Sequence, residues 1–478
     1  MGTRRWPLEP RVFVGREAPL RSLRAFFDRP DRSRITAIYG RRRVGKTRLV
    51  KEAYRDHTLL HFEGLESAGS AQQRRHFRDT LYRHTRLESH RIASTNDWSD
   101  LLLLLAEYLE KKTCVVFLDE FQWLAAGRNE LVSKLKVVWD NHIAEKAHVH
   151  LILCGSISSF LVNKVIRSRA LYGRIDEVID LGPLTLSEAR AGFFARRSAR
   201  EALEYYLAFG GVPKYLELFD DRQSTMLNIQ RLCFQPGAYF VDEFDRIFIS
   251  HFGRDRLYRK IVEFLSDRRF ASRKQIARHL EIESGGRLTG LLEDLCLASF
   301  VERYGSVHSP ASTALTRYRL ADPLLRFHSR FIRPLKGRIA RTTEGIPIHQ
   351  ALPKGRYEDF LGLAFEQFCF QHAEQIARRL GFSAVAFDYG SWFQRDDQGS
   401  GAQIDLLFKR ADRVITLCEV KFRERVGLEV VAEVEQKVTA LSKHWSHAIE
   451  KVLISALPPS PELETEGYFA HVLTADDL

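Results

Sequence analysis

The sequence predicts an α/β fold divided into about three domains. Three observations lead to this prediction. Apolar runs that end in glycine or acidic residues alternate with helical segments, which is typical of parallel sheets covered by helices. The stretch from Gly40 to Thr47 fits the pattern G-x-x-x-x-G-K-[ST] at every fixed position. The chain has 478 residues, too many for one hydrophobic core.

The glycine pattern lies in the context that a phosphate-binding loop requires. Alternating apolar residues from Ile35 to Tyr39 predict a short buried strand before it, and Arg48 begins a predicted helix after it. Backbone N–H groups of such a loop converge on one anion, and the positive end of the helix adds to the attraction. Lys46 is expected to reach the β- and γ-phosphates of ATP, and Thr47 to offer its hydroxyl to Mg²⁺. The nucleotide-binding residues predicted here are Gly40, Arg41, Arg42, Arg43, Val44, Gly45, Lys46, Thr47 and Arg48.

A second apolar run, residues 114–118, ends in two carboxylates, Asp119 and Glu120. Buried parallel strands carry such runs, and α/β sheets bind ligands at the carboxyl ends of their strands. Asp119 is expected to hold Mg²⁺ through its water shell, and Glu120 to polarise the attacking water as the catalytic residue. The alternative is an ordinary strand followed by an acid that caps a helix.

Two further features follow along the chain. Residues 149–154 predict another buried strand, and Ser156 at its end is a candidate sensor of the γ-phosphate. Arg167, Arg169 and Arg174 are candidates for an arginine finger on the chain's own nucleotide or a neighbour's, with Arg174 preferred. The alternative for these arginines is a basic loop that faces solvent.

Composition and charge restrict the possible partners. No apolar run approaches the ~20 residues of a membrane span, and no secretory signal is visible, so we expect a cytoplasmic protein without a membrane partner. The six cysteines are scattered and most lie in apolar runs, which favours buried thiols. The net charge is +12, and residues 251–350, with 19 basic and 10 acidic side chains, hold the densest positive excess. That segment is the first candidate for contact with DNA, or else a solvated basic face.

The basic segment reads as a winged helix-turn-helix. Predicted helices at residues 257–266, 271–280 and 286–298 are followed by two strands, at 300–304 and 317–320. Ser272 is a plausible N-cap of the second helix. The third helix is the expected recognition element and offers Arg287 to DNA. Packing against protein is the alternative use of such a module. The segment that follows, residues 320–332, is expected to be a buried helix.

The last part of the chain predicts a helix, two strands, a third strand, and another helix, at residues 357–381, 384–392, 403–408, 415–422 and 428–441. Glu419 and Lys421 are two apart on a strand and therefore share a face, and a hairpin is expected to bring Asp405 beside them. Adjacent carboxylates can hold Mg²⁺ or Mn²⁺ and activate a water, with Glu366 as a further ligand. The alternative is a structural hairpin with an ion pair between Glu419 and Lys421.

Six motifs in one order resemble the archaeal-type ATPase family in the AAA+/STAND group of P-loop NTPases. They are Phe-Val-Gly-Arg-Glu, the Gly-Arg-Arg-Arg-Val-Gly-Lys-Thr loop, Phe-Leu-Asp-Glu-Phe-Gln, Cys-Gly-Ser, Leu-Tyr-Gly-Arg and Gly-Gly-Val-Pro, between about residues 12 and 220. The resemblance implies a helical lid over the nucleotide and places Gly15, Arg16 and Pro213 at the nucleotide site. The Asp-Pro-Leu-Leu-Arg-Phe stretch after the winged helix also resembles a segment of this family.

Residues 357–456 are similar to the PD-(D/E)xK nuclease superfamily, although Ile404 replaces the proline before the first acid. The predicted domains are thus a P-loop ATPase core (1–180), a helical lid (181–250), a winged helix (251–335) and a restriction-endonuclease-like α/β domain (351–478). The expected function is ATP binding and hydrolysis coupled to a metal-dependent DNA nuclease, in defence or genome maintenance, with a homo-oligomer as one option. The alternative is a STAND-like signalling or DNA-binding regulator with an inactive nuclease-like domain.

Overall fold

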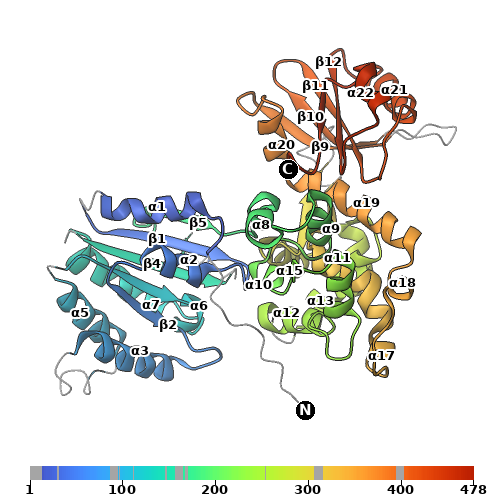
Figure 1. The fold of residues 1–478 in the computed structure, drawn as a ribbon. Helices are drawn as coiled ribbons and strands as arrows, with labels where there is room; N and C mark the ends of the chain where they lie inside the picture. The colour runs from blue at the N-terminus through green and yellow to red at the C-terminus, as the bar shows by residue number, and fades with distance from the viewer. Residues whose placement is uncertain are drawn as a thin grey trace. The chain divides into compact units, whose positions relative to one another are not determined.

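The structure is a computed structural model. It describes residues 13–28, 32–86, 95, 97–110, 112–145, 148–156, 165–166, 171–252, 255–305, 316–393 and 403–478. The chain divides into two compact units (Figure 1). The first comprises Met1–Leu184 with Val212–Lys214, and the second Thr185–Gly211 with Tyr215–Leu478.

A five-stranded parallel sheet forms the centre of the first unit, with the strand order β2-β3-β4-β1-β5. Its strands are β1 (Arg34–Gly40), β2 (Leu59–Glu63), β3 (Cys114–Asp119), β4 (Val149–Ser156) and β5 (Glu177–Asp180). The predicted α/β architecture is therefore confirmed for this unit. The strand β5 was not predicted from the sequence, because four residues are too few to show a periodic pattern.

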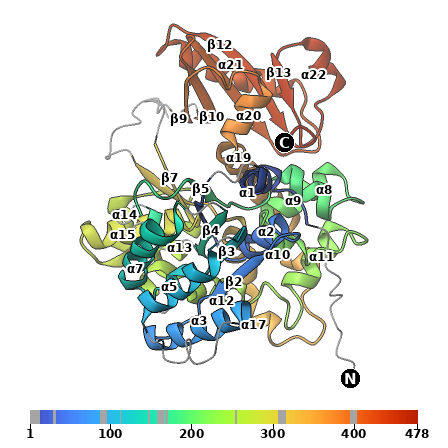
Figure 2. The same ribbon diagram turned by 90° about the vertical axis from the view of Figure 1, so that its left-hand side faces the viewer.

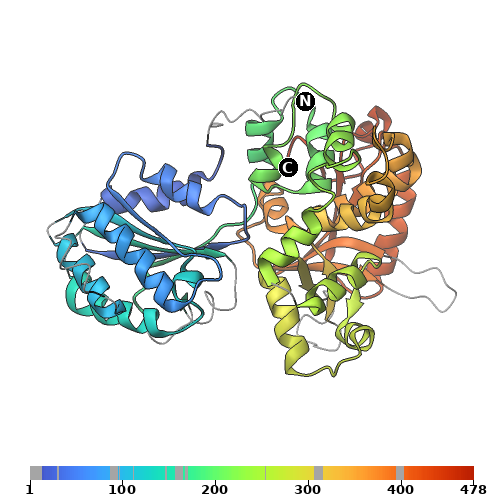
Figure 3. The same ribbon diagram turned by 90° about the horizontal axis from the view of Figure 1, so that it is seen from below.

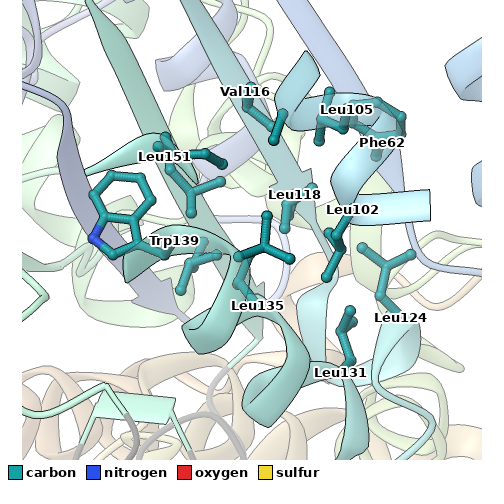
Figure 4. Packing of buried hydrophobic residues seen from close by; sticks show 14 of the residues in the cluster. Phe62, Leu102, Leu105, Val116, Leu118, Leu124, Leu131, Leu135, Trp139 and Leu151 are labelled. Carbon is teal, nitrogen blue, oxygen red and sulfur yellow. The ribbon is translucent and has the colours of Figure 1, made fainter. Parts of the chain in front are cut away.

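Helices cover both faces of this sheet. They are α1 (Glu17–Asp28), α2 (Lys46–Ala53), α3 (Ser70–Thr85), α5 (Trp98–Leu109), α6 (Phe121–Leu124), α7 (Glu130–Val138) and the π-helix η1 (Trp139–Ile143). Strand alternation divides the core. Val115 and Phe117 pack in one cluster with α1 and α2, whereas Val116 and Leu118 pack in another with α3, α5 and α7 (Figure 4). The strands of this sheet are therefore packed against helices on both faces.

Helices dominate the start of the second unit (green to yellow in Figures 1 and 3). They are α8 (Leu186–Phe193), α9 (Ala199–Phe209), α11 (Thr225–Cys233) and α12 (Glu243–Phe252), and the short helix α10 (Pro213–Leu216) begins in the first unit and ends in the second. Capping boxes open α8 at Thr185 and α9 at Ser198. Gly210 ends α9 with a φ of 71°, which confirms the sharp junction predicted at the Gly-Gly-Val-Pro stretch.

The basic middle segment contains three helices and a small antiparallel sheet of order β6-β8-β7. Its elements are α13 (Arg256–Ser266), β6 (Ala271–Ser272), α14 (Arg273–Leu280), α15 (Gly286–Leu297), β7 (Val301–Tyr304) and β8 (Arg317–Leu320). The helix predicted at 271–280 was wrong in its first two residues, because they pair with Tyr318 and Arg317 of β8 instead. Ser272 does cap α14, as predicted.

Short helical elements join this segment to the last part of the chain. They are α16 (Pro323–Phe327), the π-helix η4 (His328–Ile332), the 3₁₀ helix η5 (Arg333–Leu335), α17 (Lys336–Ile339) and α18 (Ile348–Ala351). Residues 324–325, 327–329 and 331–332 are buried, which confirms the predicted buried segment. The helix predicted over 357–381 was wrong in being continuous: His372 leaves the helical conformation and separates α19 (Lys354–Gln371) from α20 (Ala373–Arg379).

The chain ends in a mixed five-stranded sheet of order β13-β12-β11-β10-β9 (orange to red in Figures 1 and 2). Its strands are β9 (Phe387–Phe393), β10 (Gln403–Arg410), β11 (Val414–Lys421), β12 (Ala448–Ser455) and β13 (His471–Leu473), with helices α21 (Glu429–Ser442) and α22 (Pro461–Glu466). The predicted β10–β11 hairpin is confirmed, with Leu406 opposite Cys418. Ile415 and Leu417 pack in one cluster with residues of α21. Within the part of the chain that the structure describes, no helix combines the length and apolarity needed to cross a membrane.

Candidate functional site

The loop after β1 bends sharply against the end of β5. Gly45 has a φ of 94° and Arg43 a φ of 70°, so the loop takes the left-handed conformation at two places. A Cβ on Gly40 would lie 2.4 Å from the backbone oxygen of Leu181, so only glycine fits there. The turn therefore delivers the N-terminus of α2 to the carboxyl edge of the sheet, where an anion can meet its N–H groups.

Lys46, Thr47 and Asp119 form the centre of the candidate nucleotide site. The Lys46 ammonium donates hydrogen bonds to the carbonyl oxygens of Gly40 (2.8 Å) and Arg41 (3.0 Å), which holds it over the loop. The Thr47 hydroxyl donates to Asp119 Oδ2 across 2.7 Å. These two oxygens, one from a hydroxyl and one from a buried carboxylate, are the donor chemistry that fits Mg²⁺.

Asp119 stays ionised although it is buried. Burial alone would raise its pKa, but the nearby His61 ring and the hydrogen bond from Thr47 lower the pKa of the carboxyl. His61 Nε2 lies 3.5 Å from Asp119 Oδ2, and its ring stacks on Phe117. An anionic Asp119 is the form that attracts a divalent cation.

Glu120 and Ser156 stand side by side at the ends of two neighbouring strands. The Ser156 hydroxyl donates to Glu120 Oε2 across 3.1 Å, and the Gln122 amide donates to the same oxygen. Glu120 has a φ of 47°, so the chain turns at this residue. The two residues predicted separately as water activator and γ-phosphate sensor are thus in direct contact.

The remaining predicted loop residues point in different directions. Arg41 and Val44 are buried, while Arg43 and Arg48 are exposed. The Arg42 guanidinium lies 4.9 Å from the Trp123 ring centroid and 3.4 Å from Glu66. Pro213, at the start of α10, approaches to 4.0 Å the position that a Cβ on Gly45 would take. The structure therefore brings Pro213 to the loop.

Arg16 connects the loop to the segment that follows β5. This residue has a φ of 64°, and its guanidinium donates to the carbonyl oxygens of Gly182 (2.6 Å), Val44 (3.3 Å) and Pro183 (3.3 Å). Gly15 precedes it, also with a φ of 64°. These contacts place Arg16 beside the loop backbone.

Arg174 is bound to Asp140 of η1. Its Nε and Nη2 donate to the two carboxylate oxygens across 2.6 and 2.8 Å, and Lys136 adds an ion pair at 3.0 Å. The hydrogen bond from Arg174 is the main cause that lowers the pKa of Asp140 to about 2. The Arg174 guanidinium is therefore bound by a carboxylate of the first unit. The other two arginines considered for the finger role, Arg167 and Arg169, lie outside the described residues.

Two functional positions were missed by the sequence analysis. His61 contacts Asp119 only because β2 lies next to β3, and strand order is not visible in sequence. Gly64 donates its N–H to the carbonyl of Asp119, and a Cβ there would lie 2.6 Å from the Glu120 oxygen. The sequence signal for Gly64 was a glycine directly after a strand, and such a glycine does not indicate which residues it contacts.

In the middle segment, Arg287 stands exposed in the first turn of α15. Arg273 supports this region: it donates to Ser284, to the Gly285 carbonyl at 2.9 Å and to the Thr289 hydroxyl at 2.6 Å. The turn between α14 and α15 is thereby fixed, and Arg287 is presented to solvent beside it.

Glu366 of α19 and Asp405 of β10 share one cation, Arg269. Its Nη2 lies 2.7 Å from Glu366 Oε2 and 3.7 Å from Asp405 Oδ1. Gln403 donates to Asp405 across 2.7 Å. Burial, followed by the negative charge of Asp405, raises the pKa of Glu366 to about 7, although Arg269 opposes the shift. Arg269 was not predicted, because the contact joins residues far apart in sequence.

Glu419 and Lys421 lie on one face of β11, 3.0 Å apart, as the two-residue strand period requires. Both also contact α21: Lys437 approaches Glu419 to 2.6 Å, and Lys421 pairs with Glu433. Among the described residues, no group of three His, Cys, Asp or Glu side chains is placed to hold a metal ion. The structure thus collects the four predicted residues as two pairs, one at Arg269 and one at α21.

Comparisons with known proteins find one family model, one relative and several similar solved structures. Residues 13–219 match a family model described as an ATPase domain predominantly from Archaea. A protein of Methanocaldococcus jannaschii, Uncharacterized protein MJECL04, is 25% identical over 419 residues, which cover 86% of this chain and 88% of that protein. Similar solved structures include the Walker-type ATPase PABY2304 of Pyrococcus abyssi (19% identity, TM-score 0.48, 68% of this chain and 99% of that one) and the ORC2 protein of Aeropyrum pernix (14%, 0.41, 70% and 95%).

Residues 13–219 are therefore similar to an ATPase domain, and they include a phosphate-binding loop on a parallel α/β sheet. Lys46, Thr47, Asp119 and Glu120 together supply the groups that ATP binding and hydrolysis need.

Proposed function

We propose that this protein uses ATP binding and hydrolysis in its first unit to control a metal-dependent DNA nuclease in its C-terminal domain. The contact between the Thr47 hydroxyl and Asp119, at 2.7 Å, carries the ATPase part. It joins the phosphate loop to the acidic strand end, as a Mg²⁺–nucleotide site requires.

Each residue of the nucleotide site has a role in this proposal. Thr47, and Asp119 through water, would hold Mg²⁺, which would supply positive charge against the phosphates. Lys46 leaves its two loop carbonyls for the β- and γ-phosphates. Glu120 orients and polarises the attacking water, and Ser156 holds Glu120 and senses the γ-phosphate.

Two substitutions test the nucleotide site. Lys46→Ala should abolish ATP binding or turnover, whereas Glu120→Gln should bind ATP and lose at least about 100-fold in kcat, since a general base contributes that much. Lys51→Ala, an exposed lysine on the same helix α2, is the matched control and should behave as wild type. Normal hydrolysis by either site variant would refute the assignment.

The nuclease part rests on the C-terminal arrangement of α19, β10 and β11. Glu366, Asp405 and Glu419 would hold Mg²⁺ or Mn²⁺, and Lys421 would orient the water. Burial is the main cause of the raised pKa of Glu366, and the negative charges of Asp405 and Glu419 add to it; a bound cation would relieve that charge. Arg269 meets that need in the present arrangement and must move before a metal binds.

The nuclease test uses plasmid and linear DNA with Mg²⁺ or Mn²⁺, with and without ATP. Asp405→Ala and Lys421→Ala should lose cleavage, while Glu424→Ala, an exposed acid that follows β11, should retain it. Absence of nicking by the wild type, or equal nicking by the two site variants, would sink the nuclease proposal and leave the ATPase assignment intact.

A second candidate function is a STAND-like signalling or DNA-binding regulator whose nuclease-like domain is inactive. It is favoured by one observation: Arg269 pairs with Glu366, and Lys421 and Lys437 pair with Glu419, so internal cations already satisfy these carboxylates. This candidate expects tight nucleotide binding with slow turnover and salt-sensitive DNA binding without cleavage. Loss of function in Arg287→Ala, with full tolerance of Glu419→Ala, would select it.

The remaining assignments belong to the same proposal. They are the division into ATPase core, helical lid, winged helix and nuclease-like domain; DNA as the partner; assembly into a homo-oligomer; a cytoplasmic location; and a role in defence or genome maintenance. The three-helix and three-strand arrangement of residues 256–320 supports a winged helix. Sedimentation with and without ATP would test the assembly.

A further inference from the structure

A cavity of about 670 Å³ within the second unit has an unusually basic lining. It is bounded by the end of α13, by β7 and β8, by η4 and by α19 and β10. Of its 25 lining residues, eight are arginines and four are aspartates or glutamates. Glu366 and Asp405 are among those four, so the cavity opens directly onto the candidate nuclease carboxylates.

Apart from Arg319 Nη2, which lies 2.7 Å from Glu302, two buried donors in this lining lack a hydrogen-bond acceptor among the described residues. They are Arg326 Nε and the buried Ser329 hydroxyl. Arg326 Nη1 donates to Gln367, so only part of its guanidinium is engaged. Buried polar groups are rarely left without a partner, and each such group needs an explanation. An acceptor-rich ligand in the cavity would satisfy both donors.

The lining arginines differ in how their charge is used. Arg333 pairs with Asp267 at 3.1 Å, and Arg319 with Glu302 at 2.7 Å. In contrast, within the described part of the chain no carboxylate lies at ion-pair distance from Arg326, or from the exposed Arg330 one turn further on. Burial, followed by the charge of Arg319, lowers the pKa of Arg326 to about 10. An anion beside these two guanidinium groups would be strongly stabilised.

The cavity also carries aromatic rings. Phe270 is 38% exposed, and the Arg317 guanidinium lies 4.1 Å from its ring centroid. Tyr304 lines the same cavity. Arginine forks bind phosphate oxygens in pairs, and exposed rings next to a basic groove stack on nucleobases. The combination fits a ligand that has both phosphates and bases.

We propose that this cavity binds the phosphate groups of a single nucleic-acid strand and presents that strand to Glu366 and Asp405, with Arg326 and Arg330 as the principal phosphate ligands. The inference rests on the proposed nuclease function for its purpose and on the cavity itself for the binding. It also gives the Asp-Pro-Leu-Leu-Arg-Phe stretch a role: Asp322 caps α16 and Phe327 enters the core, while Arg326 between them faces the ligand.

A strand phosphate and a free nucleotide share the same chemistry, and the extent of the lining favours the strand. The lining includes Arg333 and Arg330 as well as Arg269, which contacts the two carboxylates. Phosphate chemistry by a nuclease needs such a path to its carboxylates, whereas a free nucleotide does not. An incoming phosphate would also compete for Arg269, releasing Glu366 and Asp405 for a metal ion.

The test measures fluorescence anisotropy of a 5′-phosphorylated single-stranded decanucleotide in EDTA, which separates binding from cleavage. The full chain carries Lys46→Ala so that the phosphate loop does not take the ligand. Arg330→Gln and Arg326→Gln should each weaken binding at least tenfold and make the logarithmic salt dependence shallower by about 0.7, the value for one phosphate contact on a single strand. Arg378→Gln, an exposed arginine of α20 outside the cavity, is the matched control and should leave affinity unchanged.

Three outcomes would overturn the inference: binding equal to the control in both variants, binding lost equally in all three, or displacement of the strand by ADP or inorganic phosphate at matched phosphate concentration. Arg330 is exposed, so Arg330→Gln keeps the test valid if Arg326→Gln fails to fold. Cavity-dependent binding without any cleavage in Mn²⁺ would refute the nuclease function alone. Cleavage with cavity-independent binding would refute this inference alone.

Discussion

The Ser156 hydroxyl donates a hydrogen bond to Glu120 Oε2 across 3.1 Å, which joins the ends of two adjacent strands. Ser156→Ala should lower kcat for ATP about fivefold with little change in KM. Loss of one hydrogen bond costs about 1 kcal/mol, and that cost falls on the orientation of Glu120, the carboxylate proposed to be catalytic. Steady-state ATPase kinetics measure the effect. Ser133→Ala, on the exposed side of α7, is the control, and a rise in KM alone would contradict the role given to Ser156.

Arg174 should act first as a structural anchor. Arg174→Ala is expected to lower the thermal midpoint and to change kcat less than about tenfold, because Asp140 holds two of its guanidinium nitrogens. The lowered pKa of Asp140 means that this stability is present above pH ~4 and is lost as the pH falls towards 2. The difference between wild type and variant should therefore vanish near pH 2 in circular dichroism melts. A loss of about 10³ in kcat would instead identify an arginine finger.

Gly64 should not tolerate any side chain. A Cβ there would lie 2.6 Å from the Glu120 oxygen and 2.7 Å from the Leu124 nitrogen, both backbone atoms that cannot move aside cheaply. Gly64→Ala should therefore destabilise the protein by about 1–3 kcal/mol and reduce ATPase activity through displacement of Glu120. Gly69→Ala is the matched control, since nothing lies within 4 Å of its Cβ position. Urea unfolding of both variants checks the expectation, and equal stability would refute it.

Glu366 makes stability depend on pH in the opposite sense to Asp140. Its pKa is raised to about 7, so the protonated form is favoured in the folded state. The associated stability is complete below pH ~4.5 and is lost as the pH rises through 7. Glu366→Gln should therefore raise the thermal midpoint by a few degrees at pH 8 and by almost nothing at pH 4.5. A gain of the same size at both pH values would show that charge is not the cause.

Arg287 should contact DNA through a phosphate if the middle segment binds DNA. Arg287→Ala should then weaken duplex binding a few-fold at moderate salt for any sequence and reduce the logarithmic salt dependence by about 1. Lys354→Ala serves as control, because that side chain is 88% exposed and lies at the start of α19. Filter binding at several salt concentrations distinguishes the two variants. Identical salt dependence in both would argue that this segment binds protein instead.

Local patterns in the sequence were sufficient for most of the fold. The strand before Gly40 and the run ending at Asp119 were predicted because each is a complete signal within ten residues. The same applies to Glu419 and Lys421, whose contact follows from strand geometry. In contrast, β5 is too short to give a periodic signal, and the break in the predicted 357–381 helix has no glycine or proline to mark it.

The parts of the sites that could not be predicted depend on tertiary neighbours. His61 meets Asp119 because of strand order, and Arg269 meets Glu366 because two distant segments pack together. No fixed spacing in the sequence predicts either contact. These contacts also shift the pKa values of the carboxylates. The sequence therefore predicts which residues form each site better than it predicts their charge states.

The close approach between Gly40 and Leu181 brings the phosphate loop into direct contact with the segment after β5, through which the chain leaves the first unit. The Leu181 N–H binds the Tyr39 carbonyl at 2.8 Å, and Arg16 grips both the loop at Val44 and the exit at Gly182. The loop and this segment are so close that a Cβ on Gly40 would collide with the backbone of Leu181. A nucleotide that changed the conformation of this loop would therefore act directly on the residues through which the chain leaves the first unit.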